Sequence, residues 1–494
     1  MKYILAIDQG TTGSRAIVYD VRGRQVASSY HEFTQYFPKP GWVEHDPLEI
    51  WMSVEKAIQN VLKKVDSKAI SAIGITNQRE TTVVWDRITG RPIYNAIVWQ
   101  CRRTAVRCDQ LKLRKKTLSE FKKKTGLPID AYFSATKIEW ILNHVSGARA
   151  KAQAGRLCFG TTDAWVLWNL TGGKVHATDY TNASRTMIFN IDKLSWDATL
   201  LKKFAIPKSM LPEVKPSSGI FGATVKIKKL SAGIPIAGIA GDQQAALFGQ
   251  ACFEPGSMKN TYGTGAFVLL NTGKKRSISK YGLITTVGCG KKGEPIYVLE
   301  GAIFIAGAAI QWLRDGLKVI KHAGDSEKMA RNVGDTAGVY FVPALVGLGA
   351  PYWDQNARGT ISGLTRGTTR EHLVRAAIEA MCYQTKDVLD AMQKDTGLRV
   401  TTLKVDGGAV ANNFFCQFQS DILRMKVVRP KVIETTSLGA AYLAGLAVGY
   451  WKNTRDIKKC WQQGKVFSPK MKSSSASNYY RGWKQAVEKT LTHK

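Results

Sequence analysis

The sequence predicts an α/β protein built from two domains, with a ligand site in the cleft between them. At 494 residues the chain is longer than one ordinary hydrophobic core accommodates. Short apolar strands alternate with helices along both halves, and each half contains two strands joined by a turn rich in Gly and Thr. Open α/β architectures bind ligands beyond the carboxyl ends of their strands. We therefore expect one domain over residues 1–250, a second over residues 251–494, and a central cleft between them.

The first half alternates strands and helices. Asp46-Pro47 is a typical helix start, and the apolar residues that follow it recur near helical spacing. The apolar run Ala69–Ile75 is typical of a buried strand. The expected strands are Lys2–Ile7, Arg15–Tyr19, Gln25–Phe33, Ala69–Ile75, Thr81–Trp85 and Ile234–Ile239, and the expected helices are Glu44–Lys64, Arg102–Leu127 and Gln243–Gln250.

The second half repeats this arrangement. A hairpin is expected around residues 260–267, and a long amphipathic helix is expected later in the half. The expected strands are Tyr297–Leu299, Val339–Pro343 and Thr402–Val405, and the expected helices are Phe304–Leu317, His372–Gln393 and Asn412–Leu423. The two halves thus predict a structural duplication that has diverged too far to show as a sequence repeat.

Two turns favour phosphate binding. Asp8–Arg15 places a carboxylate at a strand end, followed by Gly and paired Thr, a set that suits Mg²⁺ and phosphate oxygens. By itself this segment is equally compatible with an ordinary hairpin. The related segment Asn260–Phe267, halfway along the chain, favours a pair of phosphate loops. The first loop resembles that of the actin-like ATPase superfamily, which implies a two-domain, ribonuclease H-like fold.

Two further strand ends carry residues suited to catalysis or ligand binding. Asp242 closes an apolar strand and precedes a helix, so its carboxylate can face the cleft and accept a proton from a substrate hydroxyl. The same residue is suited to capping the helix N-terminus, and the two roles are compatible. Asp406-Gly407-Gly408 allows the backbone to approach a flat ligand or a phosphate, and is also compatible with a plain tight turn.

A third group suits a small polyol. Arg79 and Glu80 can form bidentate hydrogen bonds with hydroxyls, while Trp99 and Tyr132 can pack on C–H faces. The alternative is a structural Arg79–Glu80 ion pair with Trp99 as a core residue, and residue chemistry alone does not separate the two.

Several classes of protein are disfavoured. No G-x-x-x-x-G-K-[ST] segment occurs, which excludes a P-loop NTPase. Gly288–Gly293 matches G-x-G-x-x-G, but a strand is expected after it, so we predict a polar hairpin tip. The N-terminal apolar run is too short for a signal peptide, and no apolar stretch is long enough to span a bilayer. Eight scattered cysteines without a C-x-x-C pair favour a reducing compartment, the cytoplasm.

The net charge of +33 is unusual. It could indicate a nucleic-acid-binding protein. We favour a solvated basic surface, because the Lys-rich runs are dispersed and are not interleaved with aromatic residues in a base-stacking pattern. No specific nucleic-acid partner is expected.

Longer motifs identify a family. These motifs are Pro38–Glu44, Gly74–Glu80, Trp99–Arg103, Asp179–Arg185, Ala240–Gln244 and Asp406–Asn413. On them, the chain resembles the glycerol kinases of the FGGY family of carbohydrate kinases from Lys2 to about Trp483.

The resemblance implies the reaction ATP + glycerol → sn-glycerol 3-phosphate + ADP with Mg²⁺, in glycerol catabolism and glycerolipid precursor supply. It implies that Asp242 is the general base and that Asp8 holds Mg²⁺ through water. The implied glycerol-binding residues are Arg79, Glu80, Trp99, Tyr132, Asp242, Gln243 and Phe267, with Trp99 and Phe267 as apolar walls. The implied nucleotide-binding residues are Thr11, Thr12, Gly13, Arg15, Thr264, Gly307, Gln311, Gly408 and Asn412. Gly13 stands where many relatives have Ser, which removes one hydroxyl contact to phosphate. The resemblance places the glycerol site and first phosphate loop in the first domain, and the second phosphate loop and adenosine site in the second.

Two alternatives remain. One is a related sugar kinase, such as a xylulose or gluconate kinase, although larger sugars need a more open pocket than Arg79-Glu80 and Trp99 suggest. The other is a non-catalytic nucleic-acid-binding or sensor protein on the same fold, which would be expected to lack Asp8 or Asp242. A homo-dimer and a homo-tetramer both remain open.

Overall fold

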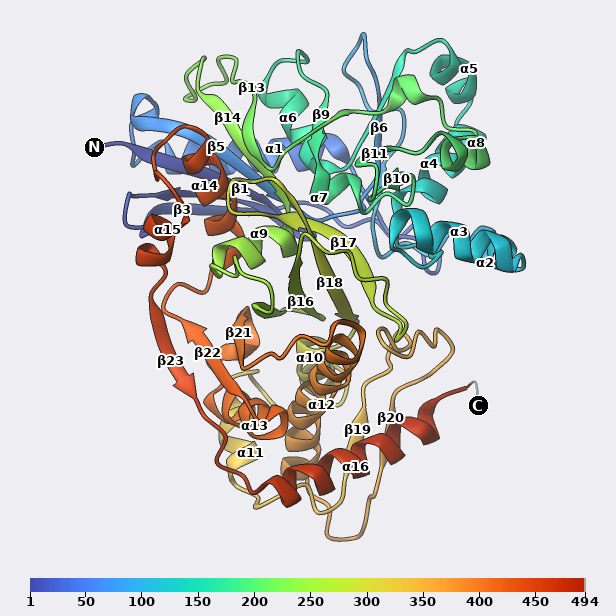
Figure 1. The fold of residues 1–494 in the computed structure, drawn as a ribbon, viewed down its shortest axis with the longest axis vertical. Coiled ribbons are helices and arrows are strands. Elements are labelled where there is room, and N and C mark those ends of the chain that lie inside the picture. The colour runs from blue at the N-terminus through green and yellow to red at the C-terminus, as the bar shows by residue number, and fades with distance from the viewer. Residues whose placement is uncertain (493–494) are drawn as a thin grey trace.

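The computed structural model describes residues 1–492, and these residues form two halves that are each built on one large β-sheet. Figure 1 shows the strands of the first 250 residues in its upper half and most of the later chain in its lower half. The predicted two-part α/β fold is therefore confirmed.

The sheet of the first half has a parallel centre and antiparallel edges. β1, β5 and β14 are parallel, so their carboxyl ends lie along one edge of the sheet. β2 and β3 continue antiparallel on one side, and β13 is antiparallel on the other. In sheet order the strands are β13 (Ser218–Ala223), β14 (Pro235–Gly241), β5 (Ile70–Asn77), β1 (Tyr3–Gln9), β2 (Gly13–Tyr19) and β3 (Gln25–Glu32).

The sheet of the second half repeats this topology. In order it contains β17 (Ile284–Cys289), β18 (Pro295–Ile303), β16 (Ala266–Gly273), β15 (Met258–Tyr262), β21 (Thr402–Asp406), β22 (Lys426–Pro430) and β23 (Gln463–Phe467). From β23 to β18 its order and strand directions match those from β13 to β3, and β17 is an additional edge strand. This match confirms the predicted structural duplication. The antiparallel β17–β18 pair also confirms that residues 288–293 end a hairpin.

Helices cover the sheets, and five short strand pairs complete the fold. The helices are α1 (Pro47–Val61), α2 (Ala105–Lys112), α3 (Lys115–Thr125), α4 (Ser134–His144), α5 (Ala148–Gln153), α6 (Thr162–Leu170), α7 (Tyr180–Ala183), α8 (Ala198–Phe204), α9 (Asp242–Gly249), α10 (Gly307–Asp315), α11 (Asp325–Arg331), α12 (Arg370–Thr396), α13 (Asn413–Leu423), α14 (Thr435–Ala447), α15 (Thr454–Cys460) and α16 (Ser473–Thr490). The short pairs are β4 (Glu44–His45) with β7 (Ala96–Ile97), β6 (Val83–Asp86) with β8 (Leu157–Gly160), β9 (Ala177–Asp179) with β12 (Glu213–Lys215), β10 (Phe189–Asn190) with β11 (Ser195–Trp196), and β19 (Tyr340–Val342) with β20 (Thr360–Ser362).

Helix boundaries follow capping and burial. Asp46 caps α1 by accepting a hydrogen bond from the Leu48 amide, as the Asp-Pro start predicted. The single helix expected over residues 102–127 is wrong, because the chain breaks between α2 and α3. Leu113 is 83% exposed and Arg114 is extended, so no buried apolar residue at this point holds the two helices in line.

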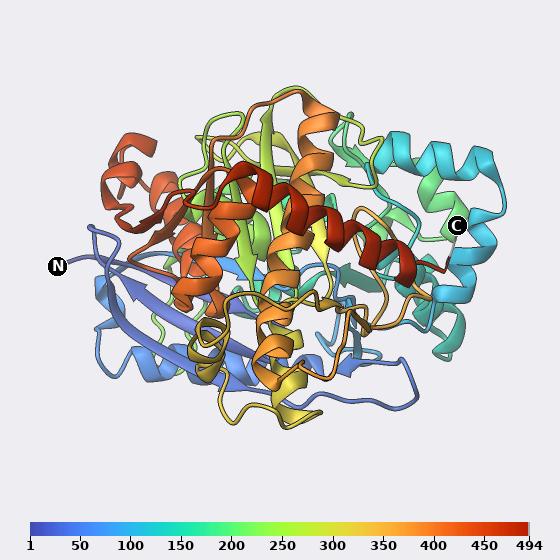
Figure 2. The same cartoon turned by 90° about the horizontal axis from the view of Figure 1, so that it is seen from below.

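One late segment returns to the first half. α14 packs against β5 and β14, and Figure 1 shows it beside β1 and β5. Glycines make this close approach possible, since a Cβ on Gly74 would lie 2.2 Å from the Ala440 carbonyl oxygen. Figure 2 shows α16 lying across α12, where the Trp483 indole donates to Asp387 at 2.8 Å. Within residues 1–492, no helix is both long and apolar enough for a membrane span.

Candidate active site

Residues from both halves line a cavity of about 220 Å³. The lining residues from the first half are Thr11, Gln78, Arg79, Glu80, Trp99, Tyr132, Asp242 and Gln243. Those from the second half are Thr261, Gly263, Thr264, Gly265 and Phe267. The structure thus brings together every predicted glycerol-binding residue and part of each predicted phosphate loop in one interdomain cleft.

Parallel strands deliver the polar residues of the first half to this cavity. β5 ends at Asn77 and leads directly into Gln78–Glu80, and β14 ends at Gly241, directly before Asp242. The Gln78 amide donates to the Gln9 carbonyl at 2.7 Å, which joins the ends of β5 and β1. The location therefore follows from sheet direction, as expected for an open α/β fold.

Glu80 is held in an unusual conformation. Its φ of +62° lies in the left-handed region, which costs free energy for a residue with a side chain. Its carbonyl oxygen accepts hydrogen bonds from Ser134 Oγ at 3.1 Å and Lys137 Nζ at 3.2 Å. Its carboxylate Oε1 accepts from Arg185 Nε at 2.5 Å. Burial raises the pKa of the Glu80 carboxyl, and the nearby guanidinium groups oppose that rise.

Arg79 is buried among carboxylates. Its Nε lies 3.0 Å from Asp242 Oδ1, and its Nη1 lies 2.5 Å from Glu300 Oε2. By contrast, the closest Arg79–Glu80 contact is 4.0 Å. A structural Arg79–Glu80 ion pair is therefore not the main contact of either residue. Arg79 lies closer to Asp242 and Glu300, and Glu80 lies closer to Arg185.

Asp242 is the first residue of α9, and Gly241 occupies the cap position. Asp242 Oδ1 accepts the Gln243 amide at 2.7 Å, and Oδ2 accepts Gln243 Nε2 at 3.1 Å. The Asp242 side chain remains 31% exposed and lines the cavity. A partly exposed carboxylate held from two sides is suited to accepting a proton from a bound hydroxyl.

Aromatic rings form the apolar side of the cavity. Trp99 and Tyr132 meet edge to face with ring centroids 5.6 Å apart, and Trp99 Nε1 donates to Thr11 Oγ1 at 3.0 Å. The Arg79 guanidinium lies 5.8 Å from the centroid of the Phe267 ring. Burial raises the pKa of Tyr132 further above its usual range, and its protonated hydroxyl can donate a hydrogen bond.

The two predicted phosphate loops close in the same way. The Gly10 amide donates to the Gly13 carbonyl at 2.9 Å, and the Gly263 amide donates to the Gly265 carbonyl at 2.9 Å. In the first loop, Tyr30 shapes the surroundings. Its hydroxyl lies 3.1 Å from Thr12 Oγ1, and a Cβ on Gly13 would lie 2.6 Å from both the His31 carbonyl oxygen and the Tyr30 side chain. A serine at position 13 would therefore require the backbone at His31 to shift as well as Tyr30.

Arg15 and Asp8 lie beside the first loop. Arg15 Nη1 forms an ion pair of 2.5 Å with Glu434, and the other N–H groups of its partly exposed guanidinium remain available for a phosphate. Burial raises the pKa of the Asp8 carboxyl to about 7, and the charge of Arg15 opposes that rise. Within residues 1–492, no group of three or more His, Cys, Asp or Glu side chains could hold a metal ion. A lone carboxylate fits Mg²⁺ held mainly by water and substrate phosphates, rather than by a protein cage.

The other predicted nucleotide-binding residues lie outside this cavity, on segments that flank the second loop. Gly307 begins α10, which also carries Gln311, and the Gly307 amide donates to the Gly263 carbonyl at 3.0 Å. Gly408 begins a 3₁₀ turn, and Asn412 caps α13 by accepting the Phe415 amide at 2.9 Å. A separate cavity of about 600 Å³ is lined by Val410, Ala411, Arg429, Pro430, Lys431, Ile433, Gly464 and Lys465.

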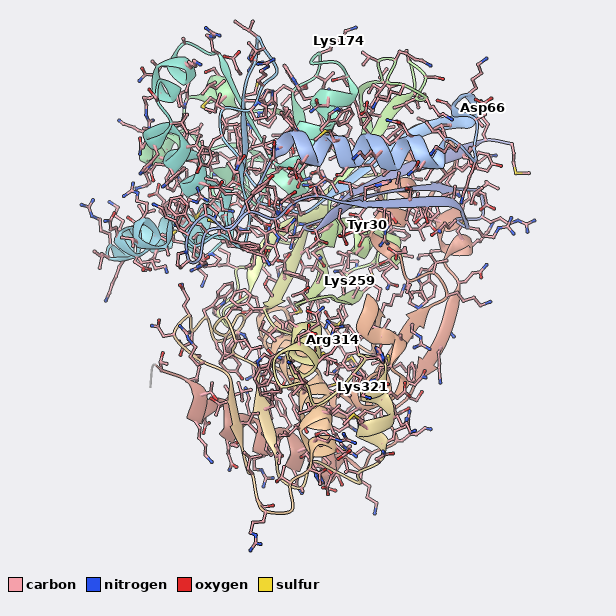
Figure 3. All side chains as sticks on the ribbon, turned by 180° about the vertical axis from the view of Figure 1, so that it is seen from behind. Tyr30, Asp66, Lys174, Lys259, Arg314 and Lys321 are labelled. Carbon is pink, nitrogen blue, oxygen red and sulfur yellow. The ribbon has the colours of Figure 1, made fainter. Side chains whose placement is uncertain are left out.

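Sequence reasoning did not single out three buried charged residues of this site. Arg185 donates a hydrogen bond to Glu80, and Glu300 accepts one from Arg79. The Lys259 ammonium donates to Gln243 Oε1. Figure 3 shows Lys259 where the two halves meet. Burial lowers the pKa of Lys259 to about 8, and the two arginines lower the pKa of Glu300 to about 2. A charged residue inside an apolar strand, such as Glu300 in β18, was the available indication.

Comparisons with known proteins agree with this geometry. Models for the N-terminal and C-terminal domains of the FGGY family of carbohydrate kinases match residues 3–249 and 258–448. Glycerol kinase 2 of Thermotoga maritima is 60% identical over 494 residues, covering 99% of this chain and 99% of that protein.

Solved structures give the same result. The crystal structure of Plasmodium falciparum glycerol kinase with ADP matches with a TM-score of 0.92 at 39% identity, covering 100% of this chain and 99% of that chain. Gluconate kinase from Lactobacillus acidophilus matches with a TM-score of 0.88 at 25% identity, covering 99% and 97% of the two chains. The chain belongs to the FGGY family of carbohydrate kinases, and to its glycerol kinase branch.

Proposed function

We propose that this chain transfers the γ-phosphoryl group of ATP to glycerol, giving sn-glycerol 3-phosphate and ADP. The observation that carries the proposal is the cavity that joins Arg79, Glu80 and Asp242 to both phosphate loops. The names of its relatives, glycerol kinases at about 60% identity over the whole chain, support the same substrate. A coupled assay of the purified protein with glycerol and a panel of C3–C6 polyols tests the proposal.

The residues of the cavity suit an in-line phosphoryl transfer. Arg79 and Glu80 hold glycerol hydroxyls, and the Trp99 and Phe267 rings cover its C–H faces. Asp242 accepts the proton of the attacking hydroxyl. Backbone amides and Thr hydroxyls of the two loops hold the phosphates of ATP, so catalysis is mainly positioning and charge stabilisation. Adenosine is assigned to the second half, near Gly307, Gln311, Gly408 and Asn412.

Mg²⁺ is proposed to act from the side of Asp8. When bound, it neutralises charge on the phosphate oxygens. Asp8 would hold it through water, since a single carboxylate at a strand end can orient a hydrated ion bound to phosphate.

The size of the cavity favours glycerol over the longer sugars of related kinases. About 220 Å³ is small for a ligand site, and ring and guanidinium groups close it on several sides. Solved xylulose and gluconate kinases share the fold over nearly the whole chain, so the pocket rather than the fold distinguishes glycerol from these larger substrates.

Asp8→Asn is expected to lower Mg²⁺ affinity or activity by about 10–100-fold, since a residue holding the ion through water is removed. The same variant should gain stability. The pKa of Asp8 is raised from 3.8 to about 7 in the folded state, so the folded protein prefers the protonated carboxyl. The resulting stabilisation is complete below pH 4 and is lost as pH rises through 7, where the buried carboxylate must ionise. Thermal unfolding without Mg²⁺ should therefore show a larger gain over the wild type at pH 8 than at pH 5.

Asp20→Asn is the matched control for Asp8→Asn. Asp20 accepts amide hydrogen bonds from Arg22 and Arg24, both at 2.9 Å, and these bonds lower its pKa. Its contribution is already complete above pH 4, so Asp20→Asn should lose stability about equally at both pH values. If Asp8→Asn raised the unfolding temperature equally at pH 5 and pH 8, this would contradict the inference that burial raises the pKa of Asp8.

The basic surface is expected to bind DNA only weakly and without sequence preference. Binding through phosphate charge alone weakens steeply between about 50 and 200 mM salt. Fluorescence anisotropy with a labelled duplex, and with a shuffled duplex of the same length as control, measures both properties. Sequence-selective binding that persists at physiological salt would favour the nucleic-acid-binding alternative.

The cellular setting is proposed on chemical grounds. All eight cysteines are free and seven are buried, which suits the reducing cytoplasm. There the reaction would serve glycerol catabolism and glycerolipid precursor supply. Sedimentation at several concentrations would distinguish a monomer from a homo-dimer or homo-tetramer.

A further inference from the structure

Glu300 is a buried carboxylate that the second half contributes to the polyol site. It lies in the middle of β18, opposite Leu269 of β16 and Ile284 of β17. Neighbouring strands on both sides therefore fix its backbone, and Figure 1 shows β18 extending toward the first half. Its side chain is fully buried.

Both partners of Glu300 are arginines of the first half. Arg79 binds it twice, with Nη1 at 2.5 Å from Oε2 and Nη2 at 3.2 Å from Oε1. Arg185 Nη2 donates to Oε1 at 3.0 Å. The charge of these arginines holds the pKa of Glu300 at about 2 despite burial, so it is ionised at neutral pH.

Arg185 links Glu300 to Glu80, because it forms hydrogen bonds with both carboxylates. Its Nε donates to Glu80 Oε1 at 2.5 Å, and the Tyr132 and Phe133 rings pack against its guanidinium at 5.5 and 5.4 Å. Its Nη1 has no hydrogen-bond partner within residues 1–492. The two carboxylates are therefore its only hydrogen-bond acceptors in the described chain.

The substrate-facing residues need such an anchor. Glu80 has a strained backbone, and Arg79 also contacts the proposed base Asp242. Without Glu300, two buried guanidinium groups would share only Glu80 and Asp242 as close carboxylates. Arg79 would then be drawn toward Asp242, and Arg185 would lose one of its two acceptors.

We propose that Glu300 is a positioning residue of the polyol site, holding Arg79 directly and Glu80 through Arg185. The inference rests on the proposed function and deepens it, because a residue of the second half then sets the geometry of the substrate site in the first. Glu300 does not line the cavity and is not assigned contact with the substrate.

The test compares Glu300→Gln with Glu300→Asp. Glu300→Gln keeps the shape and removes the charge, so kcat/KM for glycerol should fall on the order of 100-fold, as for other broken buried charge pairs. The KM for ATP should stay near the wild-type value, and calorimetry without ATP should show weakened glycerol binding. Glu300→Asp restores the charge at a shorter reach and should recover part of the activity.

Glu379→Gln is the matched control. Glu379 is also buried in the second half and accepts hydrogen bonds from Arg375 Nε at 2.8 Å and Tyr383 Oη at 2.9 Å, but it does not line the cavity. Glu379→Gln should lower the unfolding temperature and leave kcat/KM for glycerol per folded molecule unchanged. If neither Glu300 variant folds, Arg185→Lys tests the inference instead. Lys keeps the positive charge but cannot bind Glu80 and Glu300 together as the guanidinium does.

The outcomes separate this inference from the proposed function. Lack of glycerol phosphorylation by the wild type contradicts the proposed function. An active wild type together with folded Glu300→Gln of unchanged glycerol KM and kcat contradicts the positioning role. Equal losses toward glycerol and ATP would also contradict it, since they indicate general destabilisation. If the decision falls to Arg185→Lys, unchanged glycerol kinetics in that variant contradict the role as well.

Discussion

Asp242→Asn is expected to lower kcat by about 10²–10⁴-fold and to leave glycerol binding nearly unchanged. Asn keeps the shape of the side chain and can still bond with Gln243 and the substrate, but it cannot accept the proton of the attacking hydroxyl. The position of Asp242 makes the loss specific, since its side chain lines the cavity and begins α9 without being its cap.

Steady-state kinetics should be measured together with calorimetric binding of glycerol. Asp197→Asn is a suitable control, because Asp197 caps α8 outside the cavity and its loss should affect stability rather than kcat. Turnover close to the wild type in Asp242→Asn would refute the assignment of the base.

Propane-1,3-diol should be a much poorer substrate than glycerol, by about 10²-fold or more in kcat/KM. It lacks the middle hydroxyl, so buried donors and acceptors at Arg79 and Glu80 would lose a partner. Each unpaired group costs roughly 1–3 kcal/mol, and more when it is charged. Glu80 Oε2 accepts no hydrogen bond from residues 1–492, which leaves it available to a substrate hydroxyl.

The ratio of kcat/KM for the two alcohols is the quantity to measure. Arg79→Lys should reduce the ratio, because Lys cannot reproduce the fork of bonds that Arg79 makes. Glu139→Gln, which removes the partner of Arg107 outside the cavity, should leave the ratio unchanged. Equal kcat/KM for glycerol and propane-1,3-diol in the wild type would exclude the proposed roles of Arg79 and Glu80.

Local patterns determined much of the architecture. Apolar runs of strand length predicted the central strands β1, β5 and β14, because burial on both faces requires such runs. The Asp-Pro start predicted where α1 begins, because capping involves residues that are neighbours in sequence. The break between α2 and α3 was missed, because exposure of Leu113 depends on what packs nearby.

In the candidate site, too, some features were predictable from the sequence and others were not. Asp242, Arg79 and Glu80 directly follow apolar strands, so sequence order together with parallel pairing was enough to predict that they share one cavity. Which groups hold them was not predictable from order. Glu300 lies 221 positions from Arg79, and Glu434 reaches Arg15 from the start of α14, across the fold.

By itself, then, the sequence predicted the α/β class and the paired Gly/Thr-rich loops, because these depend on short-range pattern and strand direction. The resemblance to a known family supplied the residues expected to meet substrate. Only the tertiary structure decided that Gly13 faces the Tyr30 side chain, that α14 returns to the first sheet, and that Arg79 is anchored by Glu300. The physical reason is that a buried charge needs a partner within hydrogen-bond distance, and many residues could have supplied it. Packing of the two halves selected the partner.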